Sequence, residues 1–353
     1  MRLSRLCESI APYTAGEQPK DRRYIKLNTN ENPFAPSAHV KKALEEDVSS
    51  LRLYPDPECR DLREAIASVR GVKAENVYVG NGSDEVLALS FPTLFTPGQG
   101  KVYFADVTYS FYPVYCAFFG VDYETVPLNG AFEIIAEDYC NLPDAQGIIL
   151  ANPNAPTGRV LALSEIEKIL RANPNIPVIV DEAYVDFCGV SCVPLIEKFD
   201  NLIVVQTFSK SYALAGIRCG YAIANAHTIE GYFKIKDSFN SYPVSKLTQK
   251  MATAAVLDKA YYGAAANEVM ETRDSFAKRL EESGFEVLPS GSNFVFARSE
   301  KISGLKLYQM LKERGILVRN FQKPRIADFV RITVGTKEQM EVCFNTILEI
   351  VKK

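Results

Sequence analysis

Short apolar runs alternate with stretches of helical periodicity between about residue 40 and residue 245, and this alternation constrains the fold more than any other feature. Apolar, β-branched runs bounded by turn formers are typical of strands buried on both faces. Strands that alternate with helices are typical of a parallel sheet covered by helices. The expected strands cover residues 77–79, 101–104, 147–150, 178–180, 202–205 and 220–223. We therefore predict an α/β fold with a mostly parallel sheet between helices.

The pattern changes after about residue 245 to a long helix followed by shorter strands and helices. The strands expected there cover residues 285–288, 293–296, 316–318 and 329–333. Thr336 and Gln339 have the spacing of a capping box and predict the start of a final helix. We expect this part to form a smaller α+β unit.

Residues 1 to about 35 contain several prolines and no sustained periodicity, which is typical of an extended arm. We therefore predict three parts. They are an arm over residues 1–40 that packs on the small domain or on a partner subunit, a large domain over residues 41–245, and a small domain over residues 246–353.

The composition excludes several classes of protein. Forty basic and 43 acidic side chains give a net charge of −3, which predicts no nucleic-acid or membrane partner. No stretch approaches the roughly 20 apolar residues of a membrane span, and the eight cysteines form no C-x-x-C pair that would suggest zinc. His39 and His227 stand in no nucleophile or metal pattern. We expect a cytoplasmic protein with reduced thiols, no metal and small-molecule substrates.

A lysine and an aspartate each follow a predicted buried strand. Lys210 comes shortly after the run 202–205, and Asp181 ends the run that begins at residue 177. The carboxyl ends of parallel strands meet at one edge of a sheet, so both side chains would face one cleft. A neutral lysine can attack an aldehyde, and a carboxylate facing a pyridine nitrogen keeps that ring protonated as an electron sink. The pair suggests pyridoxal phosphate, although either residue alone is more often a solvated lysine or a capping aspartate.

The segment Gly80-Asn-Gly82-Ser83-Asp84 follows a predicted strand and opens a helix. Such a turn directs free backbone N–H groups and the helix dipole at an anion, so Ser83 and Asp84 are candidate phosphate ligands. The segment also imitates a dinucleotide fingerprint, with Asp106 at the end of the next strand. However, Glu85 stands in place of the third glycine. An ordinary helix N-cap at Ser83 is the alternative.

Four further features are candidates for a ligand site. The loop 152–158 is too rich in turn formers to continue a strand, and its amides could bind a phenolate oxygen. Tyr109 could stack on a planar cofactor or pack in the core. Arg319 and Arg331 lie in or beside apolar strands, where a guanidinium is uncommon without an anionic partner. Each could bind a carboxylate or phosphate, or pair with an acid of its own domain.

In their order along the chain, these segments resemble the fold-type I pyridoxal-phosphate aminotransferases, and most closely the histidinol-phosphate aminotransferases. The resemblance extends over nearly the whole chain. The segments that carry it cover residues 27–33, 54–55, 82–85, 108–109, 152–158, 181–184, 209–210, 215–220 and 331–335.

The resemblance implies roles for the cofactor site. Lys210 would bind the cofactor covalently and move the proton between it and the substrate. Asp181 would pair with the pyridine nitrogen, and Tyr109 would stack on the ring. Tyr184 and an asparagine of the loop 152–158 would bind the ring phenolate. The residues implied around the phosphate are Ser83, Asp84, Ser209 and Arg218, together with Tyr54 of a neighbouring subunit, so the active unit would be a homodimer.

The substrate side of the site is also implied by the resemblance. Arg331 would hold the α-carboxylate of glutamate or the substrate phosphate, and Arg319 and Tyr13 would help with the phosphate. Asn30 belongs to the matching segment 27–33 and is a further candidate for substrate binding. The chain departs from many relatives at Ala155, where they have the asparagine that contacts the phenolate. Asn154, or otherwise Asn152, would have to replace it.

The implied reaction is amino transfer from L-histidinol phosphate to 2-oxoglutarate by a ping-pong mechanism, giving imidazole-acetol phosphate and glutamate in histidine biosynthesis. An aromatic amino acid aminotransferase, or a decarboxylase or lyase of a phosphorylated amino acid, would share the cofactor residues. A pyridoxal-phosphate-sensing regulator would need a DNA-binding module, for which the chain has neither the extra length nor a basic face. An NAD-dependent oxidoreductase would rest only on Gly80, Gly82 and Asp106.

Overall fold

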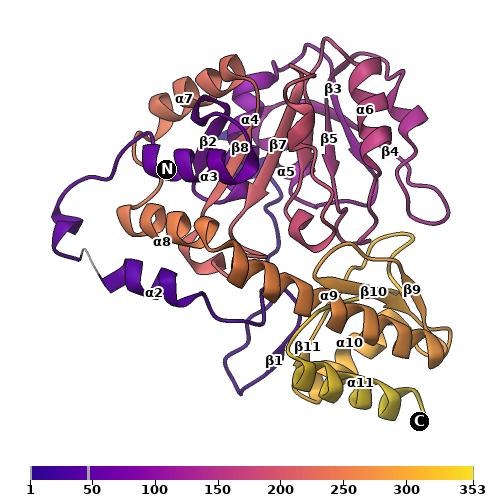
Figure 1. Ribbon diagram of the computed structural model, residues 1–353. Helices are drawn as coiled ribbons and strands as arrows, with labels where there is room; N and C mark the ends of the chain where they lie inside the picture. Colours follow the sequence, from indigo (N-terminus) through magenta and orange to yellow (C-terminus); the bar gives the residue numbers. More distant parts are fainter. Residues whose placement is uncertain (1, 46–47, 353) are drawn as a thin grey trace.

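The computed structural model describes residues 2–45 and 48–352, which form a large α/β part and a smaller part beside it (Figure 1). Within these residues, the larger sheet has seven strands. Their spatial order is β2 (Val77–Gly80), β8 (Gly220–Ile223), β7 (Leu202–Thr207), β6 (Val178–Asp181), β5 (Ala145–Ala151), β3 (Lys101–Ala105) and β4 (Asp122–Val126). All pairs are parallel except those of β8, which is antiparallel to both of its neighbours.

Helices cover both faces of this sheet. One face packs against α3 (Arg60–Arg70), α6 (Leu163–Ala172) and α8 (Lys246–Leu257). The other face packs against α4 (Ser83–Leu94), α5 (Tyr112–Phe119) and α7 (Ala226–Phe239). In β6, Val178 and Val180 belong to the first core and Ile179 to the second, because successive side chains of a strand point to opposite faces. The central strands are therefore buried on both sides.

The smaller part contains an antiparallel sheet and a two-stranded parallel ribbon. The order of the sheet is β12 (Arg319–Asn320), β13 (Val330–Thr333), β10 (Phe294–Arg298) and β9 (Glu286–Leu288). The ribbon pairs β1 (Ile25–Lys26) with β11 (Ile316–Leu317). The helices that accompany them are α9 (Lys259–Glu282), α10 (Gly304–Glu313) and α11 (Lys337–Val351). The predicted capping box is confirmed at the start of α11, where Thr336 and Gln339 bond reciprocally.

The predicted fold class is confirmed, and three details differ from the expectation. The long helix after residue 245 is two helices, α8 and α9, separated at Asp258, whose side chain caps α9. The edge strand β4 was not predicted because only Val126 of its residues is buried, so it lacks an apolar pattern. The first 35 residues, expected to be an extended arm, contain a short helix, α1 (Arg5–Ser9), and the strand β1.

The remaining elements are short helices. They are α1 (Arg5–Ser9), α2 (Ala38–Glu45) and the short 3-10 helices η1 (Val48–Arg52), η2 (Ala74–Asn76), η3 (Ala136–Tyr139), η4 (Val185–Phe187), η5 (Val193–Leu195) and η6 (Ala215–Ile217). The domain boundaries at residues 40 and 245 stay predictions. The helix after the second boundary, α8, packs on α2 and α3. None of the helices in the described ranges combines the length and apolar character needed to cross a membrane.

The sheet brings distant chain segments to one edge. Ala151 at the end of β5 is in register with Asp181 at the end of β6, and Asp181 is in register with Val205 near the end of β7. The start of β8 lies against the start of α4, because a Cβ built on Gly220 would be 2.3 Å from the backbone nitrogen of Ser83. The residues after these strands therefore converge.

We predict that Gly220→Ala destabilises the protein by about 1–3 kcal/mol, because the added methyl overlaps the backbone at the start of α4. Gly263→Ala is the matched control. Gly263 is exposed in α9 with open space around it, so alanine there should raise stability by about 0.5–1 kcal/mol. Urea unfolding followed by circular dichroism measures both variants. A Gly220→Ala protein as stable as the parent would contradict the close approach of β8 and α4.

Candidate active site

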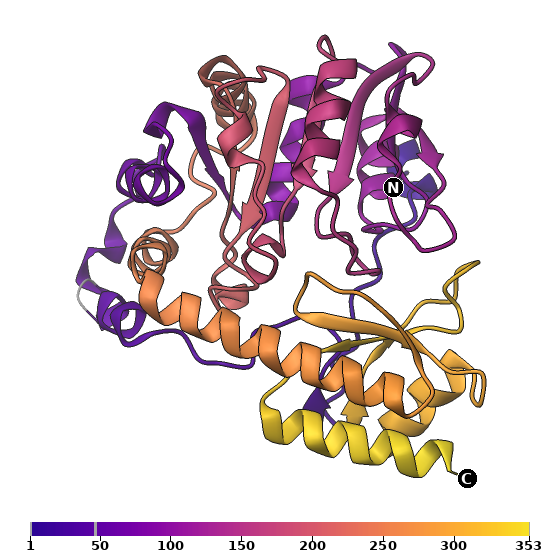
Figure 2. The same cartoon turned by 45° about the vertical axis from the view of Figure 1, so that its right-hand side comes forward.

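A cavity of about 970 Å³ lies between the carboxyl edge of the larger sheet and the smaller part, and residues of both parts line it. Figure 2 shows the loops at this edge facing the smaller part. The residues that matter most in its lining are Tyr13, Tyr109, Tyr184, Lys210, Arg319 and Arg331. Asn30 lines the cavity too, so the structure brings together seven residues predicted from the sequence.

Lys210 lines this cavity from the loop after β7. Its Nζ donates a hydrogen bond to the carbonyl of Thr29 (3.3 Å) and lies 5.6 Å from the ring centre of Tyr184. Its backbone carbonyl accepts a hydrogen bond from the side chain of Asn32 (3.1 Å). The amine is held at the cavity without an ion-pair partner among the residues that the structure describes.

Asp181 is a buried carboxylate at the end of β6, with 6% of its surface exposed. Burial raises the pKa of Asp181 to about 6, while hydrogen bonds from the Tyr112 hydroxyl (2.8 Å) and the Ala183 N–H (3.2 Å) act in the opposite direction. In the described ranges, no lysine, arginine or histidine forms an ion pair with it. A ligand carrying a cationic N–H would supply the missing charge.

Polar groups gather where β7, β8 and α4 meet. The Arg218 guanidinium donates to Ser209 Oγ (3.4 Å) and lies 3.1 Å from the Asp84 carboxylate. The first turn of α4, which begins at Ser83, presents backbone N–H groups without helical partners. A helix N-terminus beside a guanidinium and a hydroxyl is well suited to a phosphate.

Tyr109 stands between this group and the cavity. Its hydroxyl donates to Asp84 Oδ1 (2.9 Å), and its ring packs edge-on against Tyr112 at 5.6 Å. Tyr13 from the N-terminal segment stacks on Phe111 at 4.5 Å and lies 6.3 Å from Tyr109. An aromatic wall therefore borders the cavity on the side of α4.

Two guanidinium groups lie at the opposite side. Arg331 donates to the carbonyl of Asn28 (3.0 Å), and its Nε is buried without a partner. Burial lowers the pKa of Arg331, and the nearby positive charge of Arg319 adds to this effect. Arg319 bonds only to the carbonyls of Thr14 and Ala15. Because no carboxylate of the described residues pairs with either arginine, both are available to an anionic ligand.

Protein hydrogen bonds hold the two candidate asparagines of the loop 152–158. The Asn154 side chain donates to the Val107 carbonyl and Thr157 Oγ1, and it accepts from Thr108. The Asn152 side chain bonds to both backbone groups of Leu161. The contact of Asn154 with a ring oxygen therefore stays a prediction, since both amides already have protein partners. Ala155 is the residue of this loop, together with Pro156, that lines the cavity.

The side chains of two other predicted residues, Tyr54 and Asn30, contact other side chains of the protein. Tyr54 is 80% exposed, lies outside the cavity lining and stacks on Tyr242 at 4.7 Å. The Asn30 side chain is bonded to Tyr184 and Thr333. The predicted contacts of Tyr54 with a neighbouring subunit and of Asn30 with substrate stay predictions.

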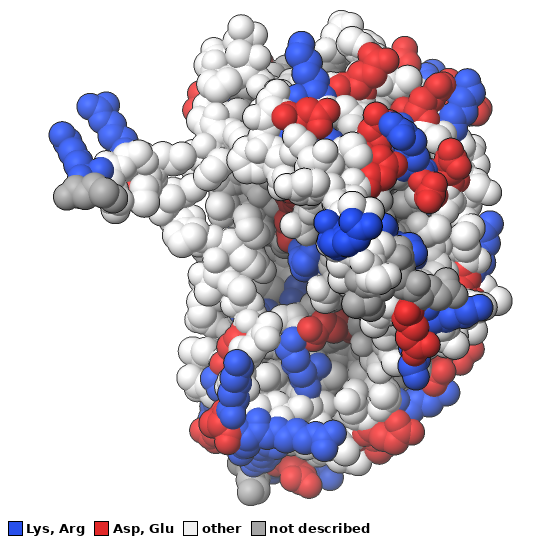
Figure 3. All heavy atoms as spheres, turned by 90° about the vertical axis from the view of Figure 1, so that its left-hand side faces the viewer, with Lys and Arg blue, Asp and Glu red and all other residues white. Residues whose placement is uncertain are grey.

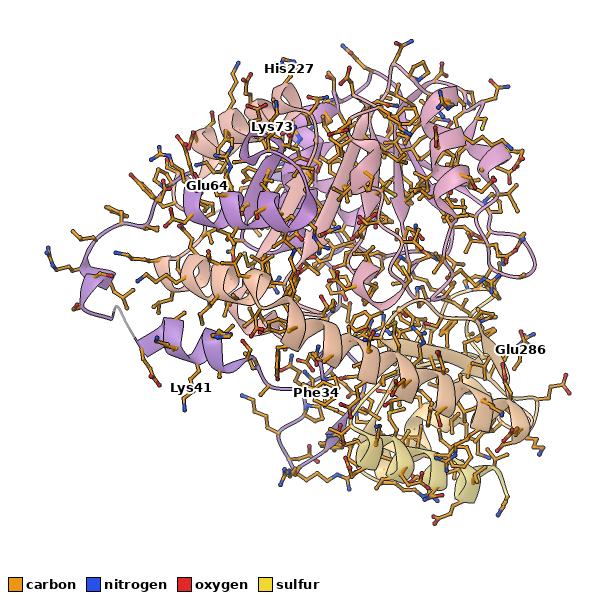
Figure 4. The ribbon with its side chains drawn as sticks, viewed as in Figure 1. Phe34, Lys41, Glu64, Lys73, His227 and Glu286 are labelled. Carbon is orange, nitrogen blue, oxygen red and sulfur yellow. The ribbon has the colours of Figure 1, made fainter. Side chains whose placement is uncertain are left out.

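The histidines lie away from the cavity. His39 bonds to the carboxylate of Asp258 (2.8 Å) at the start of α9. His227 lies at the start of α7, at the end of the large part that points away from the smaller one (Figure 4). Across the described chain, no three His, Cys, Asp or Glu side chains gather as a metal site would require.

Some residues of the site were not predicted. Tyr112 bonds to Asp181, and Arg325 forms an ion pair with Asp106 (2.7 Å) while donating to the carbonyls of Leu128 and Asn129. Tyr112 belongs to an apolar helix and is indistinguishable there from a core residue. Arg325 lies in a loop without periodicity. Only the folded chain brings each of them to its partner.

Three comparisons relate this geometry to known proteins. Residues 22–347 match the family model described as aminotransferase class I and II. A histidinol-phosphate aminotransferase from Marinomonas sp. (strain MWYL1) is 52% identical over 335 residues, which cover 94% of each chain. Another, histidinol-phosphate aminotransferase 1 from Bradyrhizobium diazoefficiens, is 50% identical over 99% of each chain.

A solved structure shows the same fold. The histidinol-phosphate aminotransferase from Sinorhizobium meliloti in complex with pyridoxal-5'-phosphate superposes with a TM-score of 0.90 and 24% identity, over 99% of this chain and 98% of that one. The resemblance predicted from the sequence is confirmed by the family model and the relatives. The cleft with its lysine and two arginines, together with the buried carboxylate at the end of β6, therefore lies in an enzyme, and this chain belongs to the aminotransferase class I and II family, within the histidinol-phosphate aminotransferases.

Proposed function

We propose that this enzyme transfers the amino group of L-histidinol phosphate to 2-oxoglutarate, with pyridoxal phosphate as its cofactor, in histidine biosynthesis. The observation that carries the proposal is Lys210 in one cleft with the guanidinium of Arg331, with the buried carboxylate of Asp181 at the end of β6, the strand next to β7. The relatives that cover nearly the whole chain bear the name of this activity. A substrate with a phosphate and a co-substrate with two carboxylates match the unpaired cations of the cleft.

The residues present fit pyridoxal phosphate. Bound there, the cofactor supplies an aldehyde carbon and an electron-withdrawing ring. Asp181 would accept a hydrogen bond from the ring nitrogen and so keep it protonated, which compensates the cost of burying the carboxylate. The first turn of α4, Ser209 and Arg218 would hold the phosphate, and Tyr109 would cover the ring.

The other residues act on the substrate. Lys210 Nζ would carry the proton to and from the substrate α-carbon, as a general base and then a general acid. Arg331 and Arg319 would hold the phosphate of histidinol phosphate and, in the second half-reaction, a carboxylate of 2-oxoglutarate or glutamate. Tyr13 also lines the cleft and stacks on Phe111. The guanidinium pair thus fixes the substrate while the lysine reacts.

We also propose that the enzyme works as a homodimer. Tyr54 is 80% exposed, Phe239 is 78% exposed, and both lie outside the cavity. A second subunit would cover them, and Tyr54 would reach the phosphate site of that subunit. The helix α1 has no buried residue, and Figure 3 shows a segment with basic side chains at its tip that projects from the body of the protein.

A cytoplasmic location is supported by the unpaired state of the cysteines, which suits a reducing compartment.

We predict that the purified enzyme forms glutamate from histidinol phosphate and 2-oxoglutarate far faster than from phenylalanine, without release of carbon dioxide. Lys210→Ala should abolish turnover because this amine is the group proposed to bind the cofactor and to carry the proton, and Lys246→Ala should retain it. A coupled glutamate assay with carbon dioxide detection measures all three. Faster turnover of phenylalanine would favour an aromatic aminotransferase, and carbon dioxide release would favour a decarboxylase.

The raised pKa of Asp181 predicts how stability depends on pH in the cofactor-free protein. The pKa is about 6 in the folded state and about 3.9 in an unfolded chain. The folded protein binds the proton more tightly than the unfolded chain does. Ionisation of Asp181 therefore lowers the free energy of unfolding as pH rises from about 4 to 6, by up to about 3 kcal/mol. Above pH 6 the loss is constant.

Asp181→Asn removes this penalty. We expect the variant to be more stable than the parent at pH 8 and to lose most of that advantage at pH 4.5, when both are cofactor-free. Urea unfolding at the two pH values measures the difference. An advantage of equal size at both pH values would contradict a buried, unpaired Asp181. Adding pyridoxal phosphate at pH 8 should stabilise the parent more than the variant.

A further inference from the structure

A strap, residues 27–32, of which Leu27, Asn28 and Asn30 are buried, connects the smaller sheet to the loop that carries Lys210. On one side, the Leu27 carbonyl accepts from the Thr333 N–H (2.9 Å), and the Asn28 carbonyl accepts from Arg331 (3.0 Å). On the other side, the Asn32 side chain donates to the Lys210 carbonyl (3.1 Å). The strap is therefore fixed to both walls of the cleft.

Asn30 lies at the middle of this strap. Its φ of +57° is in the left-handed region, which asparagine tolerates better than most residues. The Asn293 side chain donates to the Asn30 carbonyl (2.9 Å), and only 1% of Asn30 is exposed. This backbone conformation directs the Asn30 side chain between Tyr184 and Thr333.

A reciprocal pair of hydrogen bonds sets the orientation of the Asn30 amide. The Asn30 N–H donates to Thr333 Oγ1 (2.9 Å), and the Thr333 hydroxyl donates back to Asn30 Oδ1 (3.0 Å). The amide nitrogen, Nδ2, then donates to the Tyr184 hydroxyl oxygen (2.8 Å). Because this oxygen is an acceptor, the Tyr184 proton remains available to another group.

The Tyr184 proton matters because Ala155 stands where many relatives have the asparagine that contacts the ring oxygen. Asn152 and Asn154 have their amides bonded to protein groups, and Ala155 has no polar side chain. Tyr184 is then the side chain of this wall that can donate to a ring oxygen beside Lys210. Its orientation depends on Asn30.

We propose that Asn30 is a positioning residue that directs the Tyr184 proton to the ring oxygen of bound pyridoxal phosphate, with Thr333 holding the Asn30 amide. This inference rests on the proposed function. It assigns Asn30 to the cofactor side of the cleft instead of to the substrate. Thr333 and Tyr184 come from different parts of the fold, so the smaller sheet takes part in setting the electronic state of the cofactor.

The pH dependence of cofactor absorbance tests this directly. A donor to the ring oxygen draws negative charge away from the neighbouring nitrogen of the lysine linkage, so losing the donor should let that nitrogen keep its proton to higher pH. In Asn30→Asp, the side chain of residue 30 can only accept hydrogen bonds. The Tyr184 hydroxyl then donates its proton to residue 30 and no longer to the ring oxygen. We expect the midpoint of the absorbance titration to rise by about one pH unit, and kcat/KM to fall about tenfold.

Further variants separate positioning from general damage. Thr333→Val frees the Asn30 amide and should shift the midpoint in the same direction by less, whereas Thr333→Ser keeps the hydroxyl and should restore the parental value. Asn76→Ala is the matched control. The Asn76 side chain also bonds at both ends, to Ala224 and Lys73, and lies outside the cavity lining, so its loss should lower the unfolding midpoint without moving the titration.

The outcomes are distinguishable. A parental enzyme without a lysine-linked absorbance band would refute the proposed cofactor chemistry. If the parent titrates normally, an unchanged midpoint in Asn30→Asp overturns the role of Asn30 alone. Should Asn30→Asp fail to fold, an unchanged midpoint in Thr333→Val overturns it instead.

Discussion

Two charged groups without an ion-pair partner among the described residues characterise this site. Asp181 is a carboxylate held by neutral donors, and Arg331 is a guanidinium whose Nε has no acceptor among the described residues. Burying an unpaired charge costs several kcal/mol, so an arrangement with two of them is poor for stability. It is well suited to a ligand that brings a cation to one and an anion to the other. A protonated pyridine ring and an anionic substrate meet both requirements.

The sheet topology explains how these groups come to lie together. Parallel strands β5, β6 and β7 end at one edge, which places Asp181 and Lys210 on neighbouring strands. The antiparallel strand β8 begins at the same edge, next to the start of α4, and Arg218 precedes it. The smaller sheet supplies Arg319 and Arg331, and the strap joins the two sides. The two walls of the cleft therefore supply different functional groups.

Much of this arrangement was predictable from the sequence. Strands such as 178–180 are apolar throughout because both faces are buried, and the side chains at their carboxyl ends are polar because they face the cleft. Lys210 and Asp181 stand out for that reason, and Arg319 and Arg331 stand out as charged side chains in or beside apolar strands. The edge strand β4 has no such pattern, since its exposed side chains need not be apolar.

The hydrogen bonds of the site were not predictable in the same way. Asn30 and Thr333 are 303 positions apart, and no local sequence pattern predicts the hydrogen bonds between them. The resemblance implied that Asn154, or otherwise Asn152, contacts the ring oxygen, and this contact stays a prediction. In the folded chain, the Asn154 amide bonds to Val107, Thr108 and Thr157. Residue type and spacing indicate what a side chain can do, and tertiary contacts decide whether it is free to do it.

The central claim is that Lys210 carries the cofactor. The most direct measurement is borohydride reduction of the enzyme loaded with pyridoxal phosphate, followed by digestion and mass spectrometry of the labelled peptide. The account predicts a single stable pyridoxyl group on Lys210. A label on a different lysine, or tight binding of the cofactor with no label, would contradict it.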